Sequence, residues 1–123
     1  MLDASALLAY LQGEPGSEAV EAALPTAIMS VVNVAEVASK LIDRGFPAGD
    51  IAEMLGELLF ETWDADLDLA FRAGAMRAES RLPGLSLGDR FCLSLAEATS
   101  LPALTADRAW ADLDSKIDIR LIR

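Results

Sequence analysis

The chain has 123 residues, 53% of them hydrophobic, which is enough for one folded domain with a proper core. Twenty acidic and ten basic residues give a formal net charge of −10, and histidine is absent. This composition excludes nucleophile systems that use histidine and zinc sites that use histidine ligands. The single cysteine, Cys92, excludes an internal disulfide and fits a reducing cytoplasm, and the apolar runs are too short to predict a transmembrane helix.

The order of apolar segments and Gly/Pro breaks predicts strands that alternate with helices. The expected strands are residues 1–3 (only the end of a strand), 26–30, 60–63, 103–105 and 117–122. The expected helical segments are 4–12, 17–24 (with Ser17 as N-cap), 31–44, 48–59, 66–81, 86–99 and a turn at 108–113. This alternation predicts an α/β fold of three layers, in which helices flank both faces of a central, mainly parallel sheet.

Four acidic residues stand in short segments that are otherwise apolar: Asp3, Glu36, Asp89 and Asp107. A buried, isolated carboxylate costs free energy, which a hard cation such as Mg²⁺ or Mn²⁺ relieves because it binds carboxylate oxygen. Asp3 and Asp107 end expected strands, and Glu36 and Asp89 come early in expected helices. Ligands of parallel sheets bind at the carboxyl ends of the strands, so we expect one shared site for phosphodiester chemistry.

Each acidic residue also has an alternative interpretation that needs no ligand. Asp3 and Asp107 suit the N-cap positions of the segments that follow them, and Asp89 suits a capping box. Glu36 has Lys40 four residues later, which is the spacing of a surface ion pair on a helix. These alternatives stay open for each residue taken alone, whereas the four residues together favour one site.

The acidic net charge is ambiguous for nucleic-acid binding, which usually needs a basic surface. Bound cations offset such charge locally, and a basic protein partner is attracted to it. Arg90 and Arg108 directly follow two of the acidic candidates, which makes them candidates for contact with a substrate phosphate.

Four motifs in order carry a family resemblance over nearly the whole chain. They are residues 2–9 (LDASALLA), 30–37 (SVVNVAEV), 85–96 (LSLGDRFCLSLA) and 104–110 (LTADRAW). With these motifs the chain resembles PIN-domain ribonucleases, specifically the VapC toxins of type II toxin–antitoxin systems. The resemblance implies a single PIN domain over residues 1–123.

The resemblance also implies an endoribonuclease that depends on Mg²⁺ or Mn²⁺ and hydrolyses RNA with water activated by the ion. It implies that Asp3, Glu36, Asp89 and Asp107 are the catalytic and metal-binding residues. Ser5, Asn33 and Thr105 occupy places suited to hydrogen bonds with this quartet. The implied partners are an RNA substrate (tRNA or another structured RNA), a VapB-like antitoxin and a second copy of the chain.

One departure from the family pattern is the short segment before Asp3, where only Met1 and Leu2 stand. It suggests a short or truncated first strand and keeps open an alternative, a catalytically silent PIN-like module that acts through protein contacts. A phosphatase of the haloacid dehalogenase type needs Asp-x-Asp after the first strand, but Ser5 stands at the place of the second Asp.

Overall fold

Strands of three residues each alternate with longer helical segments that cover them. The computed structural model describes residues 1–79 and 84–123. Its strands are β1 (Ile28–Ser30), β2 (Glu61–Trp63), β3 (Ala103–Thr105) and β4 (Ile119–Leu121). Its α-helices are α1 (Ala4–Leu11), α2 (Ser17–Ala23), α3 (Val31–Asp43), α4 (Ala48–Glu57), α5 (Leu67–Ala75) and α6 (Leu87–Thr99). Three 3₁₀ helices complete this part of the chain: η1 (Leu24–Thr26), η2 (Met76–Ala78) and η3 (Arg108–Asp112).

The strands form two parallel pairs, β1 with β2 and β3 with β4. Residues 1–3 connect the two pairs. The N–H of Leu2 donates to Ile28 O (2.9 Å), while Leu104 N–H donates to Met1 O (2.8 Å) and Asp3 N–H donates to Leu104 O (3.0 Å). The expected strand end therefore exists as a single parallel bridge between Leu2 and Leu104. Parallel strands flanked by helices confirm the predicted α/β class.

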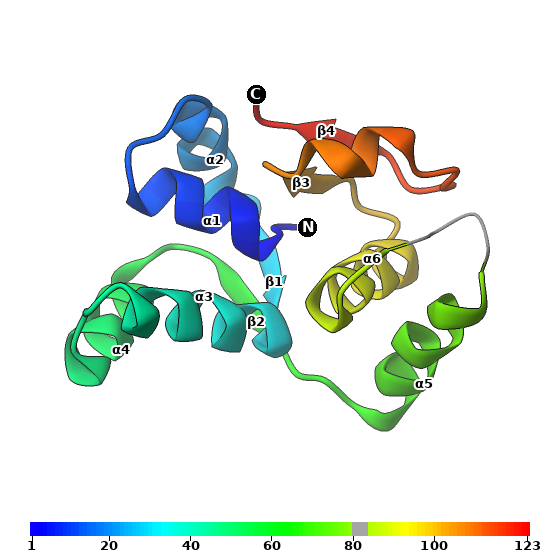
Figure 1. The fold of residues 1–123 in the computed structure, drawn as a ribbon, viewed down its shortest axis with the longest axis horizontal. Helices are drawn as coiled ribbons and strands as arrows, with labels where there is room; N and C mark the ends of the chain where they lie inside the picture. The colour runs from blue at the N-terminus through cyan, green and yellow to red at the C-terminus, as the bar shows by residue number, and fades with distance from the viewer. Residues whose placement is uncertain (80–83) are drawn as a thin grey trace.

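Alternating side chains of the strands enter two separate cores, because successive residues of a strand point to opposite faces. Leu2 and Met29 belong to the core formed with α1 to α4, whereas Met1 and Ala103 belong to the core formed with α5, α6 and Trp110. Figure 1 shows the strands between these two groups of helices. The sheet is thus the middle layer of three.

Several predicted boundaries were wrong: α4 ends at residue 57 and not 59, β1 begins at residue 28 and not 26, β4 covers 119–121 and not 117–122, and two further helix boundaries differ for a visible reason. The helix expected over residues 66–81 ends as α5 at Ala75 and continues only as the tighter turn η2, and residues 80 and 81 lie outside the described residues. Ser17 is the first residue of α2 and not its N-cap. Gly16 holds the N-cap position with φ of 91°, because it lies against Ile122, whose backbone leaves no room for a Cβ.

The helices are short, with at most 13 residues among those described. None of those within residues 1–79 and 84–123 has the length and apolar character that a bilayer-spanning segment needs.

Candidate active site

Asp3 is the most buried of the four acidic candidates, with 2% of its surface exposed. It is the N-cap of α1, and its Oδ2 accepts hydrogen bonds from the Ser5 N–H (3.2 Å), the Ser5 hydroxyl (2.5 Å) and the Thr105 hydroxyl (2.9 Å). Burial raises the pKa of Asp3, and the nearby charge of Asp89 adds to this, while the hydrogen bonds act in the opposite direction. Asp3 is therefore held firmly but carries a costly charge.

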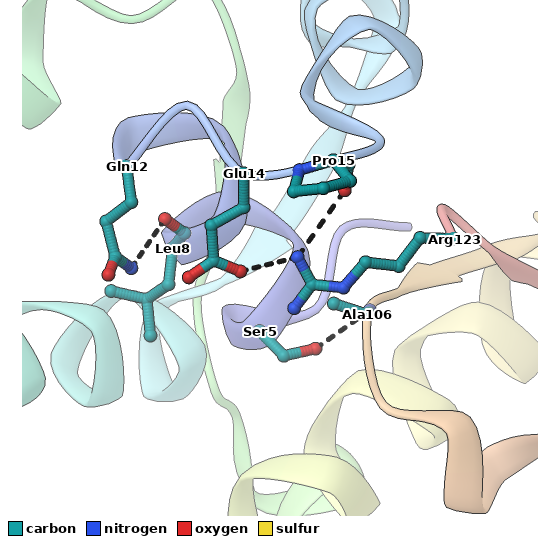
Figure 2. A network of polar contacts seen from close by, with 7 residues as sticks. All are labelled: Ser5, Leu8, Gln12, Glu14, Pro15, Ala106 and Arg123. Carbon is teal, nitrogen blue, oxygen red and sulfur yellow. Dashed lines mark hydrogen bonds and ion pairs between the residues drawn. The ribbon is translucent and has the colours of Figure 1, made fainter.

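The two hydroxyl groups that hold Asp3 also fix the end of β3. Thr105 Oγ1 accepts the N–H of Asp107 (3.0 Å), and Ser5 Oγ accepts the N–H of Ala106 (3.0 Å; Figure 2). The two hydroxyl oxygens lie 3.0 Å apart. These bonds bring Asp107 beside the start of α1, although the two segments are about a hundred residues apart in the chain.

Glu36, in the first half of α3, is positioned by packing against α6, and no hydrogen bond holds its buried oxygen. Its Oε2 is buried and has no hydrogen-bond partner in the part of the chain that the structure describes. The carboxylate lies against Gly88 of α6, at a place that the Cβ of any other residue would occupy, and Asn33 Nδ2 donates to Gly88 O (3.1 Å) beside it. Burial raises the pKa of Glu36, and the charges of Asp3 and Asp89 raise it further.

The alternative interpretation of Glu36, an ion pair with Lys40, is not found among the ion pairs of the described residues. Lys40 acts on Glu36 only through its charge, which lowers the pKa of Glu36 and opposes the larger effect of burial. The surface ion-pair interpretation of Glu36 is therefore wrong.

Asp89 and Asp107 both serve as helix caps. Asp89 Oδ2 accepts the N–H of Ser86 (2.7 Å) while Ser86 Oγ accepts the N–H of Asp89 (3.1 Å), which completes the capping box of α6. Asp107 is the N-cap of η3, and its Oδ1 accepts the N–H of Ala109 (2.9 Å). The capping interpretations of Asp3, Asp89 and Asp107 are confirmed, yet capping uses only one oxygen of each carboxylate.

One cavity of about 450 Å³ brings the four acidic residues together. The residues that line it are Asp3, Ser5, Leu8, Ala9, Gln12, Glu14, Glu36, Lys40, Arg44, Ser86, Asp89, Ala106, Asp107 and Arg123. The predicted shared site thus has a physical counterpart at the start of α1, α3, α6 and η3.

The basic residues that line the cavity differ from the two arginines that follow acidic candidates in the sequence. The described lining includes neither Arg90 nor Arg108, and Arg90 instead donates to Ser86 O (3.3 Å) and to Ala73 O (3.0 Å) of α5. Lys40 and Arg44 were detectable, because their spacing places them on the face of α3 that carries Glu36. Arg123 had no local signal, since its partner Glu14 is 109 residues away in the chain.

Comparisons with known proteins identify the family. The model of the PIN domain matches residues 1–116. The chain belongs to the PIN domain family. A comparison with curated proteins finds no match. Among solved structures, this PIN domain is similar to a chain of a toxin–antitoxin complex from Klebsiella pneumoniae, with 21% identity and a TM-score of 0.76 over 99% of this chain and 96% of the other. At this identity the likeness shows the shared fold.

The donor chemistry of this PIN domain fits a divalent cation such as Mg²⁺ or Mn²⁺. The cavity offers only hard oxygen ligands, one buried carboxylate oxygen without a partner among the described residues, and two carboxyl groups whose pKa values are raised. In the side-chain positions seen here, however, no three Asp, Glu or Cys residues among the described ones are arranged to hold an ion. Cation binding therefore requires movement of these side chains, and Asp107 is exposed enough to move.

Proposed function

We propose that this PIN domain, residues 1–123, is a metal-dependent endoribonuclease and the toxin of a type II toxin–antitoxin system. The observation that carries the proposal is the meeting of Asp3, Glu36, Asp89 and Asp107 in one cavity of a PIN domain. In the absence of histidine, carboxylates are the groups suited to this chemistry. The proposed substrate is RNA, with tRNA or another structured RNA as the expected target, and the proposed location of the protein is the cytoplasm.

The four carboxylates have distinct roles in this proposal. Asp3 and Glu36 supply the buried oxygen ligands for Mg²⁺ or Mn²⁺, because their negative charges have the least access to water. Asp89 and Asp107, which are less buried, would complete the set of metal ligands, each with the carboxylate oxygen that does not cap a helix. A bound divalent cation supplies charge that stabilises the phosphate in the transition state and lowers the pKa of water.

Ser5, Thr105 and Asn33 orient the ligands without contact with the substrate. Ser5 and Thr105 donate to Oδ2 of Asp3 and leave its other oxygen for the ligand. Asn33 keeps the first turn of α6 beside Glu36 through its bond to Gly88 O. Such supporting bonds typically contribute about 10- to 100-fold to metal affinity or activity.

The proposal is tested by RNA cleavage in Mg²⁺ or Mn²⁺, with EDTA and Asp89→Asn as controls. We expect cleavage that both controls abolish, and products with a 5′-phosphate and a 3′-hydroxyl. Products with a 2′,3′-cyclic phosphate would overturn the mechanism, because they arise from attack by the RNA's own 2′-hydroxyl. Cleavage that survives EDTA would overturn the role of the metal.

A VapB-like antitoxin and a second copy of the chain are the proposed protein partners. The similar Klebsiella pneumoniae chain comes from a toxin–antitoxin complex, and the acidic cavity suits an inhibitory Arg or Lys of such a partner. Leu67 and Phe71 of α5 are exposed by 70% and 69% and are four residues apart, so they lie on one helix face and support self-association. Sedimentation of the purified chain, compared with Phe71→Glu, tests the dimer.

A catalytically silent PIN-like module is the second candidate. The observation that favours it is that Asp3, Asp89 and Asp107 already have structural roles as caps, with no ion-binding group of three acids among the described residues. Calorimetric titration with Mn²⁺ separates the two candidates. Binding that Glu36→Gln abolishes supports the enzyme, whereas no binding by the wild-type chain supports the silent module.

A further inference from the structure

Three cations line the cavity beside its acidic residues. Asp3 and Glu36 lie towards the N-terminal ends of α1 and α3, whereas Lys40, Arg44 and Arg123, together with the acidic Glu14, lie where these two helices end. We call Lys40, Arg44 and Arg123 the basic rim. Because an α-helix rises 1.5 Å per residue, Arg44 lies about 12 Å beyond Glu36 along α3. Lys40 lies only about 6 Å beyond Glu36 and acts on it through its charge, so the basic rim begins beside the acidic residues and extends away from them along α3.

Arg123 is held in a fixed position that leaves part of its guanidinium free. Figure 2 shows its side chain reaching across to the loop that follows α1, where Nη1 donates to Glu14 Oε2 (2.5 Å) and to Pro15 O (3.4 Å). The guanidinium has five N–H groups, so Nε and Nη2 keep donors for which the described residues provide no acceptor. About a third of the side chain is exposed. Arg123 can therefore receive an anion without losing its bond to Glu14.

Lys40 and Arg44 have no ion-pair partner within residues 1–79 and 84–123. One explanation is that they complement the negative end of the α3 dipole, where cations are favourable. That explanation does not apply to Arg123, which lies in no helix and comes to the cavity from the opposite end of the chain. Two distant segments thus place cations at one end of the cavity.

We propose that the basic rim binds a backbone phosphate of the RNA beside the one that is cleaved. This inference rests on the proposed function, because it takes RNA as the substrate of the acidic end. A chain with a net charge of −10 repels RNA at long range, so a local cluster of cations is needed to hold the strand. The rim contributes three of the ten basic residues to one cavity, and arginine pairs with phosphate through two parallel hydrogen bonds. The strand would then lie along α1, from the rim to the carboxylates.

The test is equilibrium binding of a fluorescent single-stranded RNA to the Asp89→Asn protein in Mg²⁺, so that cleavage does not interfere. The Arg44→Gln/Arg123→Gln double variant of this protein should bind about tenfold more weakly. Its slope of log Kd against log salt should fall by about 0.7 for each phosphate that the variant no longer neutralises. Arg72→Gln/Arg120→Gln is the matched control, because it removes the same charge from arginines paired with Asp68 and Asp118 outside the cavity. Equal losses of affinity in both double variants, or no loss in the first, would overturn the proposal.

Glu14→Gln separates phosphate binding from a structural role of the Glu14–Arg123 pair. If the pair only fastens the loop after α1, Glu14→Gln and Arg123→Gln should weaken RNA binding alike. If Arg123 binds phosphate, Glu14→Gln should keep or improve RNA affinity, because it removes a negative charge beside an intact Arg123. Equal weakening by both variants would overturn the role of Arg123.

Failure of this inference differs from failure of the proposed function. If the wild-type chain cleaves RNA and the rim variants keep its affinity and salt dependence, the rim proposal is wrong and the ribonuclease stands. If the wild-type chain does not cleave RNA but binds it through the rim, the ribonuclease is wrong, the rim's place beside a cleaved phosphate is wrong with it, and only its contact with RNA phosphate stands. Binding of polyglutamate through the rim, with no effect of the rim variants on RNA, would assign the rim to an acidic peptide instead.

Discussion

The start of α1 and the first half of α3 place carboxylates in the same cavity but hold them in opposite ways. Asp3 accepts three hydrogen bonds from Ser5 and Thr105, whereas Oε2 of Glu36 is buried without a partner among the described residues. Burial raises the pKa of both groups. Hydrogen bonds therefore position Asp3, whereas Glu36 is positioned by packing against Gly88, which leaves its Oε2 free for a ligand.

Removing the charge of Asp3 is expected to have the largest effect. Asp3→Asn keeps an oxygen that accepts from Ser5 and Thr105, so the fold is preserved while a metal ligand is lost. We expect RNA cleavage to fall by about 100-fold or more. Without divalent cations, the melting temperature at pH 7 should rise, because a buried charge has been removed. A parallel loss of activity and stability would contradict this separation.

The pH dependence of this stability gain follows from the sign of the shift. The pKa of Asp3 is raised by burial above its ordinary value of 3.8, so the folded state binds its proton more tightly than the unfolded state. The stability that this group contributes is full below pH 3.8 and is lost as the pH rises through the raised pKa. The melting-temperature advantage of Asp3→Asn, measured in EDTA, should therefore shrink in acid and grow towards neutral pH.

A change beside Glu36 tests whether space alone holds its carboxylate. The Cβ of Gly88→Ala would overlap Oε2 of Glu36, so we expect a loss of about 10- to 100-fold in cleavage as the carboxylate is displaced. Gly74→Ala in α5 is the matched control, because nothing lies within 4 Å of its added Cβ. The control should keep full activity and gain about 1 kcal/mol in the free energy of unfolding. Full activity of Gly88→Ala would show that Glu36 does not depend on this contact.

Loss of one hydroxyl tests the hydrogen-bonded side of the comparison. Thr105→Val removes a donor to Asp3 and an acceptor for the Asp107 N–H, which should cost about 1–3 kcal/mol in urea unfolding and about tenfold in activity. Thr99→Val is the control, because the Thr99 hydroxyl donates only to the backbone carbonyls of Leu95 and Ala96 within α6. Similar losses in both variants would argue against a special role of Thr105.

Divalent cations should stabilise the fold through the same two carboxylates. At 100 times the dissociation constant, Mn²⁺ should add about 2.7 kcal/mol to the free energy of unfolding, and EDTA should remove this gain. Glu36→Gln should reduce the gain, because it replaces the free carboxylate oxygen with a neutral amide. Thermal unfolding with and without Mn²⁺ measures the difference. An equal gain in Glu36→Gln would exclude Glu36 as a ligand.

Local patterns in the sequence were sufficient for the existence of the helices and for most of their starts, and for the acidic side of the cavity. The capping box of Ser86 and Asp89 marks the start of α6 through residues three positions apart, and Asp3 and Asp107 mark helix starts in the same way. These contacts are predictable because both partners lie within one turn. The same local rule failed for Glu36 and Lys40, where tertiary packing against Gly88 directs the carboxylate into the protein.

The contacts that join distant segments were not predictable from one sequence. Three features depend on residues that are remote in the sequence: the Glu14–Arg123 pair, the contact of Glu36 with Gly88, and the early end of α5. Arg90 was expected near phosphate from its place after Asp89, yet its guanidinium binds the end of α5 through Ala73 O. The place after Asp89 in the sequence was therefore not enough to put the guanidinium of Arg90 into the cavity.

The single bridge at Leu2 has a consequence for how the protein loses function on heating. Among the described residues, only residues 1–3 join the two strand pairs by strand-like hydrogen bonds. Asp3, whose carboxylate lies in the cavity, directly follows the bridging residue Leu2. A local opening there would separate Asp3 from Thr105 and withdraw Met1 and Leu2 from the two cores, while the helices of each core remain in contact with one another. Thermal inactivation should then precede global unfolding, and the amides of Leu2 and Leu104 should exchange with solvent earlier than those of α6.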